Sequence, residues 1–184
     1  MMLCLLATSP VLAADWEAGA RKAEVCVACH GANGNATLPG VPSLAAQPAL
    51  HTFLQLVQFR EKRRSDAAMS PFAEKRSNGD MQDIGAYFAA QKPAAPTFQA
   101  DAAKAAAGRK LLEAHHCGSC HMHDLSGQNQ VPRLAGQNYA YLVKQMRGLK
   151  DGSRRDIDGT MASAAQALSD QDIENLAHYL AGMK

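Results

Sequence analysis

The chain has 184 residues, a formal net charge of +2 and only 5% aromatic residues. The near balance of 19 Lys and Arg against 17 Asp and Glu excludes a protein that binds nucleic acid through a strongly basic surface. The length allows one domain or two small ones. Hydrophobic residues make up 47% of the chain, much of it alanine, so each of two small domains would build only a thin core from its own side chains.

Residues 1–14 form a short apolar run that ends in small residues, as a secretory signal peptide does. Val11 and Ala13 suit a cleavage site, and we expect the mature chain to begin at Asp15. The run is too short to span a membrane, and it lacks the usual positive charge at its start. From the apolar run and its small residues we predict export to the periplasm and removal of Cys4 with the signal peptide. The alternative is a buried N-terminal helix.

Two five-residue segments, Cys26–His30 and Cys117–His121, share the pattern Cys-x-x-Cys-His. This pattern is the attachment signature of a c-type haem. Its thiols form thioethers with the porphyrin vinyl groups, and its histidine becomes an axial ligand of the iron. The predicted thioether residues are Cys26, Cys29, Cys117 and Cys120, and the predicted iron ligands are His30 and His121. Two covalent haem c groups would also supply the apolar volume that the thin cores lack.

Other cysteine sites fit the spacing less well. A four-cysteine zinc site would need the two pairs about 15–20 residues apart, and here the separation is far longer. A thioredoxin-like dithiol expects alternating strands and helices, and the sequence shows no strand pattern. Export agrees with haem attachment, which takes place outside the bacterial inner membrane.

An internal repeat divides the chain into two modules. The segment 41–47 returns as 131–137, and Ser77 and Tyr87 return as Ser169 and Tyr179 at an offset of 92. We predict a signal peptide at 1–14, an N-terminal domain at 15–92, an extended Pro- and Ala-rich linker at 93–97 and a C-terminal domain at 98–184.

Each module is predicted to be all-α, with about three helices and long loops wrapped around a haem. The predicted helices are 15–25, 48–61 and 80–90 in the first module and 101–116, 138–149 and 169–180 in the second, from their helical periodicity. Ser169 and Asp172 resemble a capping box at the start of the last helix. Long loops are uncommon in an ordinary domain, and here they would form the walls of a haem pocket.

The second axial ligand decides between electron transfer and ligand binding. The candidate methionines are Met69, Met81, Met122, Met146, Met161 and Met183. The repeat selects Met69 and Met161, which share the offset of 92 and lie about 40 residues after their histidines, in loops ahead of the last helix. Met81 and Met146 align with apolar residues and are predicted to be core.

The histidines outside the two motifs do not repeat. We interpret His51 and His178 as helix-surface residues, and we expect His115, His116 and His123 to lie near the second haem without ligating its iron. A bis-histidine haem that uses one of these three residues is the alternative.

Prolines and leucines of the repeated segment are predicted to form the haem pocket. Pro42 and Pro132 follow their histidines by 12 and 11 residues, so their carbonyls are candidates to accept the second imidazole N–H of each ligand. Leu44 and Leu134 would pack on the haem. Arg63-Arg64 and Arg154-Arg155 precede the methionines, either as a solvated basic rim or as partners of haem propionates.

Taken together, these motifs resemble the diheme class I cytochromes c of the cytochrome c4 type, over essentially the whole mature chain. The resemblance implies two tandem class I cytochrome c domains with close haem edges and His/Met iron. It implies a periplasmic carrier, not an enzyme, that relays single electrons from a quinol-oxidising cytochrome bc complex or a dehydrogenase to a terminal oxidase, through transient contacts with membrane complexes. The second methionine loop is two residues longer than the first, which is a departure within the repeat.

Two other functions stay open at this point. The chain could be the haem subunit of a larger oxidoreductase, such as a flavocytochrome sulfide dehydrogenase. It could also be a diheme enzyme, for example a peroxidase-like or thiosulfate-oxidising protein, which would need an open, labile or non-methionine ligand at one iron.

Overall fold

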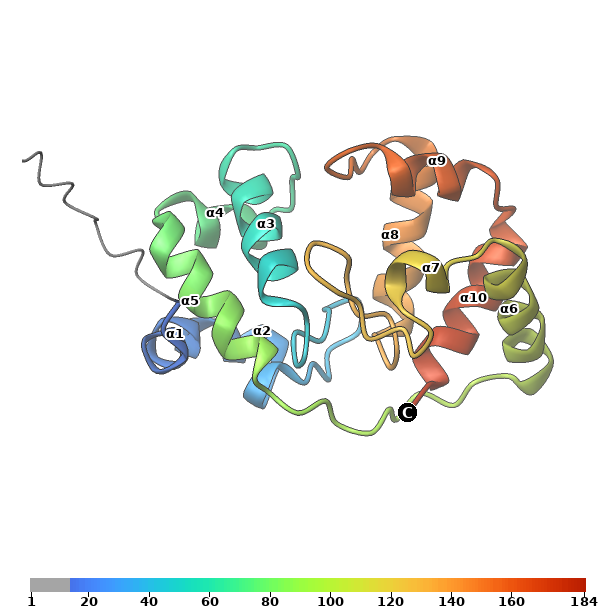
Figure 1. Ribbon diagram of the computed structural model, residues 1–184, viewed down its shortest axis with the longest axis horizontal. Coiled ribbons are helices and arrows are strands. Elements are labelled where there is room, and N and C mark those ends of the chain that lie inside the picture. Colours follow the sequence, from blue (N-terminus) through green and yellow to red (C-terminus); the bar gives the residue numbers. More distant parts are fainter. Residues whose placement is uncertain (1–13) are drawn as a thin grey trace, which may run out of the picture.

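The computed structural model describes residues 14–184, so residues 1–13 of the predicted signal peptide lie outside the described residues. Two helical bodies lie side by side, and an extended segment along one edge connects them (Figure 1). We call them the N-domain (residues 15–92) and the C-domain (residues 98–184). The connecting segment between α5 and α6 contains residues 93–97 and forms no helix.

All regular elements within residues 14–184 are helical, apart from one isolated bridge between Gln128 and Val131. The N-domain contains α1 (Trp16–Ala23), η1 (Glu24–Cys26), α2 (Val27–His30), η2 (Ala32–Gly34), α3 (Ala49–Arg60), α4 (Met69–Glu74) and α5 (Asn78–Ala89). The C-domain contains α6 (Ala102–Ala114), α7 (Gly118–His121), α8 (Tyr139–Asp151), α9 (Thr160–Gln166) and α10 (Asp170–Gly182). In this described part, none of the helices has the length and hydropathy needed to cross a membrane.

The all-α prediction is confirmed, and the three long helices of each domain match the predicted ranges to within a few residues. The predicted capping box at the last helix is present in both domains. The Ser169 hydroxyl accepts a hydrogen bond from the Asp172 N–H, and the Asp172 carboxylate accepts one from the Ser169 N–H. Ser77 and Asp80 form the same pair of bonds. The short helices α4 and α9 were not predicted, because the methionine segments were expected to be loops.

The first and last helices of each domain cross at a glycine. α1 packs on α5 and α6 packs on α10. A Cβ atom at Gly19 would lie 2.0 Å from the carbonyl oxygen of Asp83, and one at Gly108 would lie 2.1 Å from that of Asn175. The backbones approach so closely that only glycine fits at either crossing.

Gly108→Ala is therefore expected to lower the free energy of unfolding by about 1–3 kcal/mol, because the α6 and α10 backbones must separate. Denaturant unfolding of the holoprotein measures this loss. The control is Gly79→Ala in α5, where the added Cβ meets only the Ser77 hydroxyl at 3.8 Å. A Gly108→Ala protein as stable as the Gly79→Ala protein would contradict the close crossing.

An ion-pair cluster also holds α1 to α5. The Nζ of Lys22 lies 2.8 Å from an Asp80 carboxylate oxygen and 2.6 Å from an Asp83 carboxylate oxygen. The bond to Lys22, together with bonds from Ser77, lowers the pKa of Asp80 to about 2. A carboxyl group whose pKa is lower in the folded state stabilises the fold above its unfolded pKa, and this stabilisation disappears as the pH falls through the folded pKa.

Lys22→Met is expected to shrink the loss of stability that the wild type shows between pH 4 and pH 2, since Asp80 then titrates closer to its ordinary value of 3.8. Denaturant unfolding at several pH values in this window measures the effect. Lys110→Met on exposed α6 surface is the matched control. Equal acid sensitivity of wild type and Lys22→Met would show that the cluster does not contribute.

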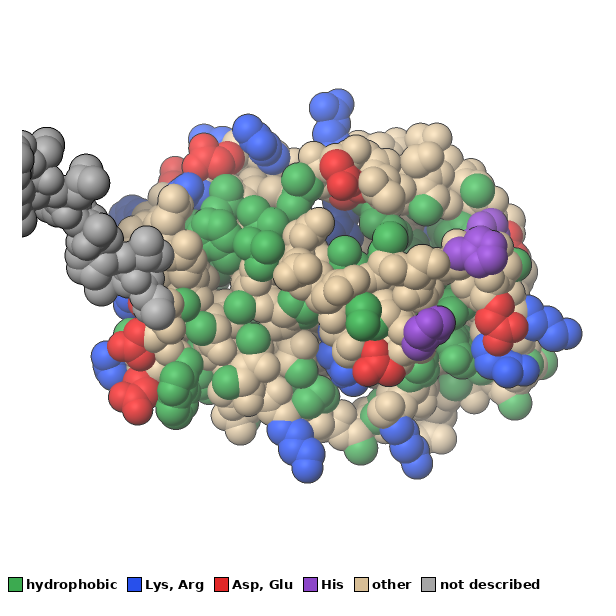
Figure 2. All heavy atoms as spheres, viewed as in Figure 1, with side chains coloured by type: hydrophobic (Ala, Val, Ile, Leu, Met, Phe, Trp, Pro, Cys, Tyr) green, Lys and Arg blue, Asp and Glu red, His purple; other side chains and the backbone are tan. Residues whose placement is uncertain are grey.

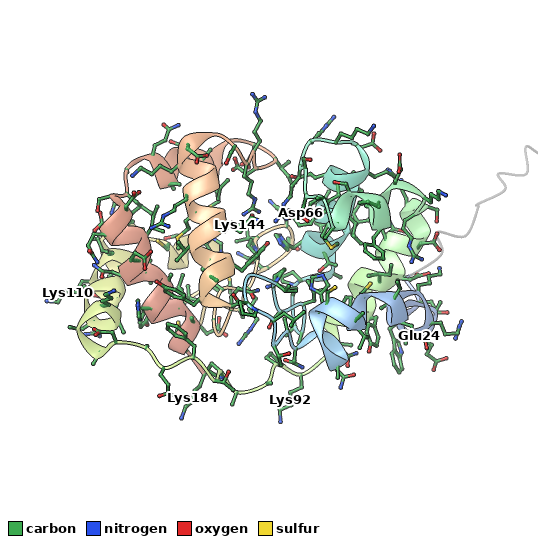
Figure 3. The ribbon with its side chains drawn as sticks, turned by 180° about the vertical axis from the view of Figure 1, so that it is seen from behind. Glu24, Asp66, Lys92, Lys110, Lys144 and Lys184 are labelled. Carbon is green, nitrogen blue, oxygen red and sulfur yellow. The ribbon has the colours of Figure 1, made fainter. Side chains whose placement is uncertain are left out.

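Polar contacts join the two domains. Lys144 of α8 and Asp66 of the N-domain face each other across the boundary (Figure 3), with 3.5 Å between Nζ and a carboxylate oxygen. Arg64 donates to the hydroxyl of Tyr141 at 3.1 Å and to the side-chain oxygen of Gln145 at 2.9 Å. The loops around residues 38–47 and 130–138 supply further bonds.

Candidate haem sites

Each Cys-x-x-Cys-His motif ends in a short helix that carries its histidine into the interior. His30 ends α2 and His121 ends α7, with exposed fractions of 5% and 4%. The Nδ1 atom of His30 lies 2.8 Å from the carbonyl oxygen of Pro42, and that of His121 lies 2.9 Å from that of Pro132. These are the two contacts expected from the proline spacing. Because Nδ1–H donates to a carbonyl, Nε2 keeps its lone pair for a metal.

Burial also sets the protonation of these histidines. Removal from solvent lowers the pKa of both His30 and His121, against the opposing effect of the proline carbonyls. Both imidazoles are therefore neutral at neutral pH, which is the form that ligates a metal.

The cysteines of each motif form no disulfide. Cys29 and Cys120 are exposed, whereas Cys26 and Cys117 are half-buried and burial raises the pKa of their thiols. One accessible and one sheltered sulfur at each motif fit two bonds along one edge of a flat ring.

Met69 and Met161 begin the unpredicted helices rather than lying in loops. Met69 is the first residue of α4 and Met161 the second residue of α9, and both side chains are half-buried. An aspartate accepts the backbone N–H of each: Asp66 at 3.2 Å and Asp156 at 2.7 Å. The aspartate precedes its methionine by three residues in the N-domain and by five in the C-domain, so this is where the second loop is longer.

Apolar side chains lie near the predicted ligands. Leu44 packs with Cys26 against the core of α1 and α5, and Leu134 packs on the core of the C-domain. Figure 2 shows hydrophobic side chains gathered on the N-domain over α3 and α4, the helices that carry half-buried Phe53, Val57 and Met69. An apolar surface beside a buried imidazole and a thioether fits a haem.

Two arginines at the domain boundary, Arg64 and Arg154, form no ion pair with a carboxylate in the part of the chain that the structure describes. Arg154 is half-buried, and its Nε is buried without a hydrogen-bond partner among the protein atoms. Burial, together with nearby Arg64, lowers the pKa of Arg154 to about 10. Arg63 and Arg155 are exposed. Two neighbouring guanidinium groups with an unpartnered buried donor fit an anionic group such as a haem propionate.

Comparison with known protein families shows to which family the chain belongs. Its sequence matches the family model described as Cytochrome c twice, over residues 17–94 and 105–184. The chain belongs to the cytochrome c family. This cytochrome is 34% identical to cytochrome c4 of Pseudomonas aeruginosa over 180 residues, which cover 93% of this chain and 90% of that protein.

Two further relatives refine this placement. The crystal structure of reduced recombinant cytochrome c4 from Pseudomonas stutzeri matches with a TM-score of 0.87 and 33% identity, over 94% of this chain and 100% of that chain. A protein of Thiomonas intermedia named thiosulfate dehydrogenase electron acceptor is 32% identical, over 91% of this chain and 82% of that protein. The predicted resemblance and the fold of two tandem cytochrome c domains are confirmed. The protein is a diheme, cytochrome c4-like electron-transfer protein with two covalent haem c groups.

Two histidines that were predicted to lie on helix surfaces are half-buried rather than fully exposed. His51 lies against the C-domain, where its Nδ1 is 2.9 Å from the Gln130 carbonyl oxygen, and burial lowers its pKa to about 4. His178 packs on the rings of Phe98 and Tyr139. His115, His116 and His123 are exposed.

Met81 and Met146 lie in the domain cores, as the sequence predicted. Met81 is fully buried in the N-domain core, and Met146 packs against the C-domain core. Met183 also packs there. Gln47 and Gln137 end the two copies of the repeated segment, and each is only 5% exposed, although the sequence pattern predicted no role for them. Their identical place in the repeat was the signal that could have indicated a shared role.

Proposed function

We propose that the protein is a periplasmic carrier that relays single electrons between a quinol-oxidising complex or a dehydrogenase and a terminal oxidase. The observation that carries this proposal is the matched pair of buried histidines, each oriented by a proline carbonyl and each followed by a methionine at the start of a short helix. Two equivalent sites in one chain suit a relay better than a single reaction centre.

The proposed ligand set follows from that arrangement. The haem of the N-domain is bound through Cys26 and Cys29 with His30 and Met69 on its iron, and that of the C-domain through Cys117 and Cys120 with His121 and Met161. Pro42 and Pro132 hold the imidazoles, while Leu44 and Leu134 pack against the rings. When bound, each haem supplies one-electron chemistry between Fe(II) and Fe(III).

The protein controls this chemistry through its own side chains. The carbonyl bonds of His30 and His121 hold each imidazole in one tautomer and one orientation. The thioether sulfurs of Met69 and Met161 favour the reduced iron and so raise the potential. As ligands of the iron, they would also leave no open position for substrate or water at the metal. This closure supports a carrier rather than an enzyme.

Arg64 and Arg154 are the candidate partners of the haem carboxylates. We propose that these guanidinium groups receive propionates at the domain boundary, which supplies the missing partner of Arg154 Nε. The negative charge would also offset the two effects that lower the pKa of Arg154 in the protein alone, which are burial and repulsion from Arg64.

A redox titration with absorption spectra of the purified protein tests the proposed function. We expect two haems per chain, a Met–Fe(III) near-infrared band from both, and no carbon monoxide binding by the reduced protein. Avid binding of carbon monoxide at either haem would instead support the peroxidase-like enzyme. Recovery of the protein in the periplasmic fraction with Asp15 as its first residue tests the proposed location.

The alternative is a haem subunit of a larger oxidoreductase, such as a flavocytochrome sulfide dehydrogenase. The relative named thiosulfate dehydrogenase electron acceptor favours a dehydrogenase as one partner. Native mass in a membrane-free extract separates the two functions. A monomeric mass supports the free carrier, whereas co-purification with an enzyme in fixed ratio would replace it with the subunit.

A further inference from the structure

Two buried glutamines, one in each domain, form hydrogen bonds with the backbone of the opposite domain. The side-chain amide of Gln47 donates to the carbonyl oxygen of Arg133 at 2.9 Å and accepts the N–H of the same residue at 3.0 Å. Gln137 of the C-domain does the same with Ser43, at 2.9 Å and 2.8 Å. The two glutamines and the two residues that they grip are related by the same offset of 90 along the chain. The contact is therefore a reciprocal exchange between the two domains.

Ser43 and Arg133, which bind the glutamines, directly follow the two prolines whose carbonyls accept hydrogen bonds from the histidines. The carbonyl of Pro42 and the N–H of Ser43 belong to one planar peptide unit, and so do the carbonyl of Pro132 and the N–H of Arg133. In the first unit the carbonyl accepts from His30 while the N–H donates to Gln137. In the second unit the carbonyl accepts from His121 while the N–H donates to Gln47.

Each histidine is thus connected to the opposite domain by two hydrogen bonds through one peptide unit. On the path from His30 to Gln137, the Nδ1 of His30 lies 2.8 Å from the Pro42 carbonyl oxygen, and the N of Ser43 lies 2.8 Å from the Gln137 side-chain oxygen. On the path from His121 to Gln47, the corresponding distances are 2.9 Å and 3.0 Å. Hydrogen bonds in such a chain polarise one another, so a bond to the N–H makes the carbonyl a better acceptor. The second bond of each glutamine fixes the position of the loop.

We propose that Gln137 and Gln47 are positioning residues that act in trans: Gln137 orients and polarises the histidine of the N-domain haem, and Gln47 that of the C-domain haem. Docking of the domains therefore sets the potential of both haems. The inference rests on the proposed function in one respect, namely that His30 and His121 ligate iron.

The expected effect is crossed between the domains. Gln137→Met keeps the side-chain volume but removes both bonds to Ser43. The Pro42 carbonyl then holds the His30 N–H less strongly, and the imidazole becomes a weaker donor to the iron, so the potential of the N-domain haem rises. Gln47→Met should raise that of the C-domain haem alone.

Proton exchange and redox titration followed by NMR spectroscopy resolve the two haems. In the reduced, diamagnetic protein, exchange of the His30 Nδ1 proton is expected to be about fivefold faster in Gln137→Met, with that of His121 unchanged. Gln47→Met should reverse the pattern. Gln137→Glu keeps an acceptor for the Ser43 N–H and should slow the exchange at His30. This variant carries the test if Gln137→Met does not fold.

Two controls separate an effect of the glutamine hydrogen bonds from a general weakening of the contact between the domains. Gln145→Met removes another bond across the boundary, to Arg64, without touching either histidine loop. Gln171→Met makes the same substitution on the exposed surface of α10. Both should leave the two Nδ1 protons unchanged. An effect in the same domain as the substitution, an equal effect on both haems or no effect would overturn the proposal. A wild type without His/Met spectra would instead overturn the ligand assignment itself.

Discussion

Met161→His is expected to lower the reduction potential of one haem by roughly 0.2 V, a fraction of the about 0.8 V range that axial ligands command. An imidazole stabilises Fe(III) relative to a thioether, so the iron that Met161 is proposed to ligate should become harder to reduce. The other haem should keep its potential, because its own methionine is untouched. A redox titration would then show two well-separated one-electron steps.

Met69→His provides the mirror experiment for the N-domain haem. The control is Met146→Leu, a volume-conserving change at a methionine that packs in the C-domain core. If Met161→His left both potentials unchanged while the near-infrared Met–Fe(III) band stayed at full intensity, Met161 would not be the ligand. Met183, half-buried in the same domain, would then be the next residue to test.

Replacement of Cys117 and Cys120 by alanine is expected to leave one haem per chain and to unfold the C-domain. A haem held by no thioether is easily lost, and the remaining apolar core is thin for a domain of this size. The N-domain contains its own helices α1 to α5 and its own core clusters, so it should stay folded. Haem-to-protein ratio and far-ultraviolet circular dichroism measure the two losses.

Ser119→Ala, inside the same motif, is the matched control and should retain both haems. Replacement of Cys26 and Cys29 by alanine tests the N-domain in the same way. Two haems per chain after the loss of Cys117 and Cys120 would show that attachment does not depend on this motif.

Periodicity and repetition made most of the helical framework predictable. The long helices contain enough residues for a helical pattern to show, and Ser77 and Ser169 mark the last helix of each domain with their capping boxes. Helices α4 and α9 have only six and seven residues. Such short helices contain too few turns for periodicity to reveal them.

The contacts between the domains could not be predicted in this way. The glutamine side chains bind backbone atoms, and every residue except proline offers the same backbone groups, so the sequence contains no complementary partner to find. The contact of His51 with the C-domain could not be predicted for a related reason. The pattern of one module shows which face of a helix is polar, but it does not show that the other module covers that face.

The reciprocal glutamine contact has a consequence for how such a chain diverges. An interface in which the same patch serves both sides would hold two identical copies together as well as two fused ones. Because the gripped groups are backbone groups, Ser43 and Arg133 occupy equivalent places with unrelated side chains. Duplicated halves can therefore accumulate differences in charge and loop length, and specialise, while their association is preserved.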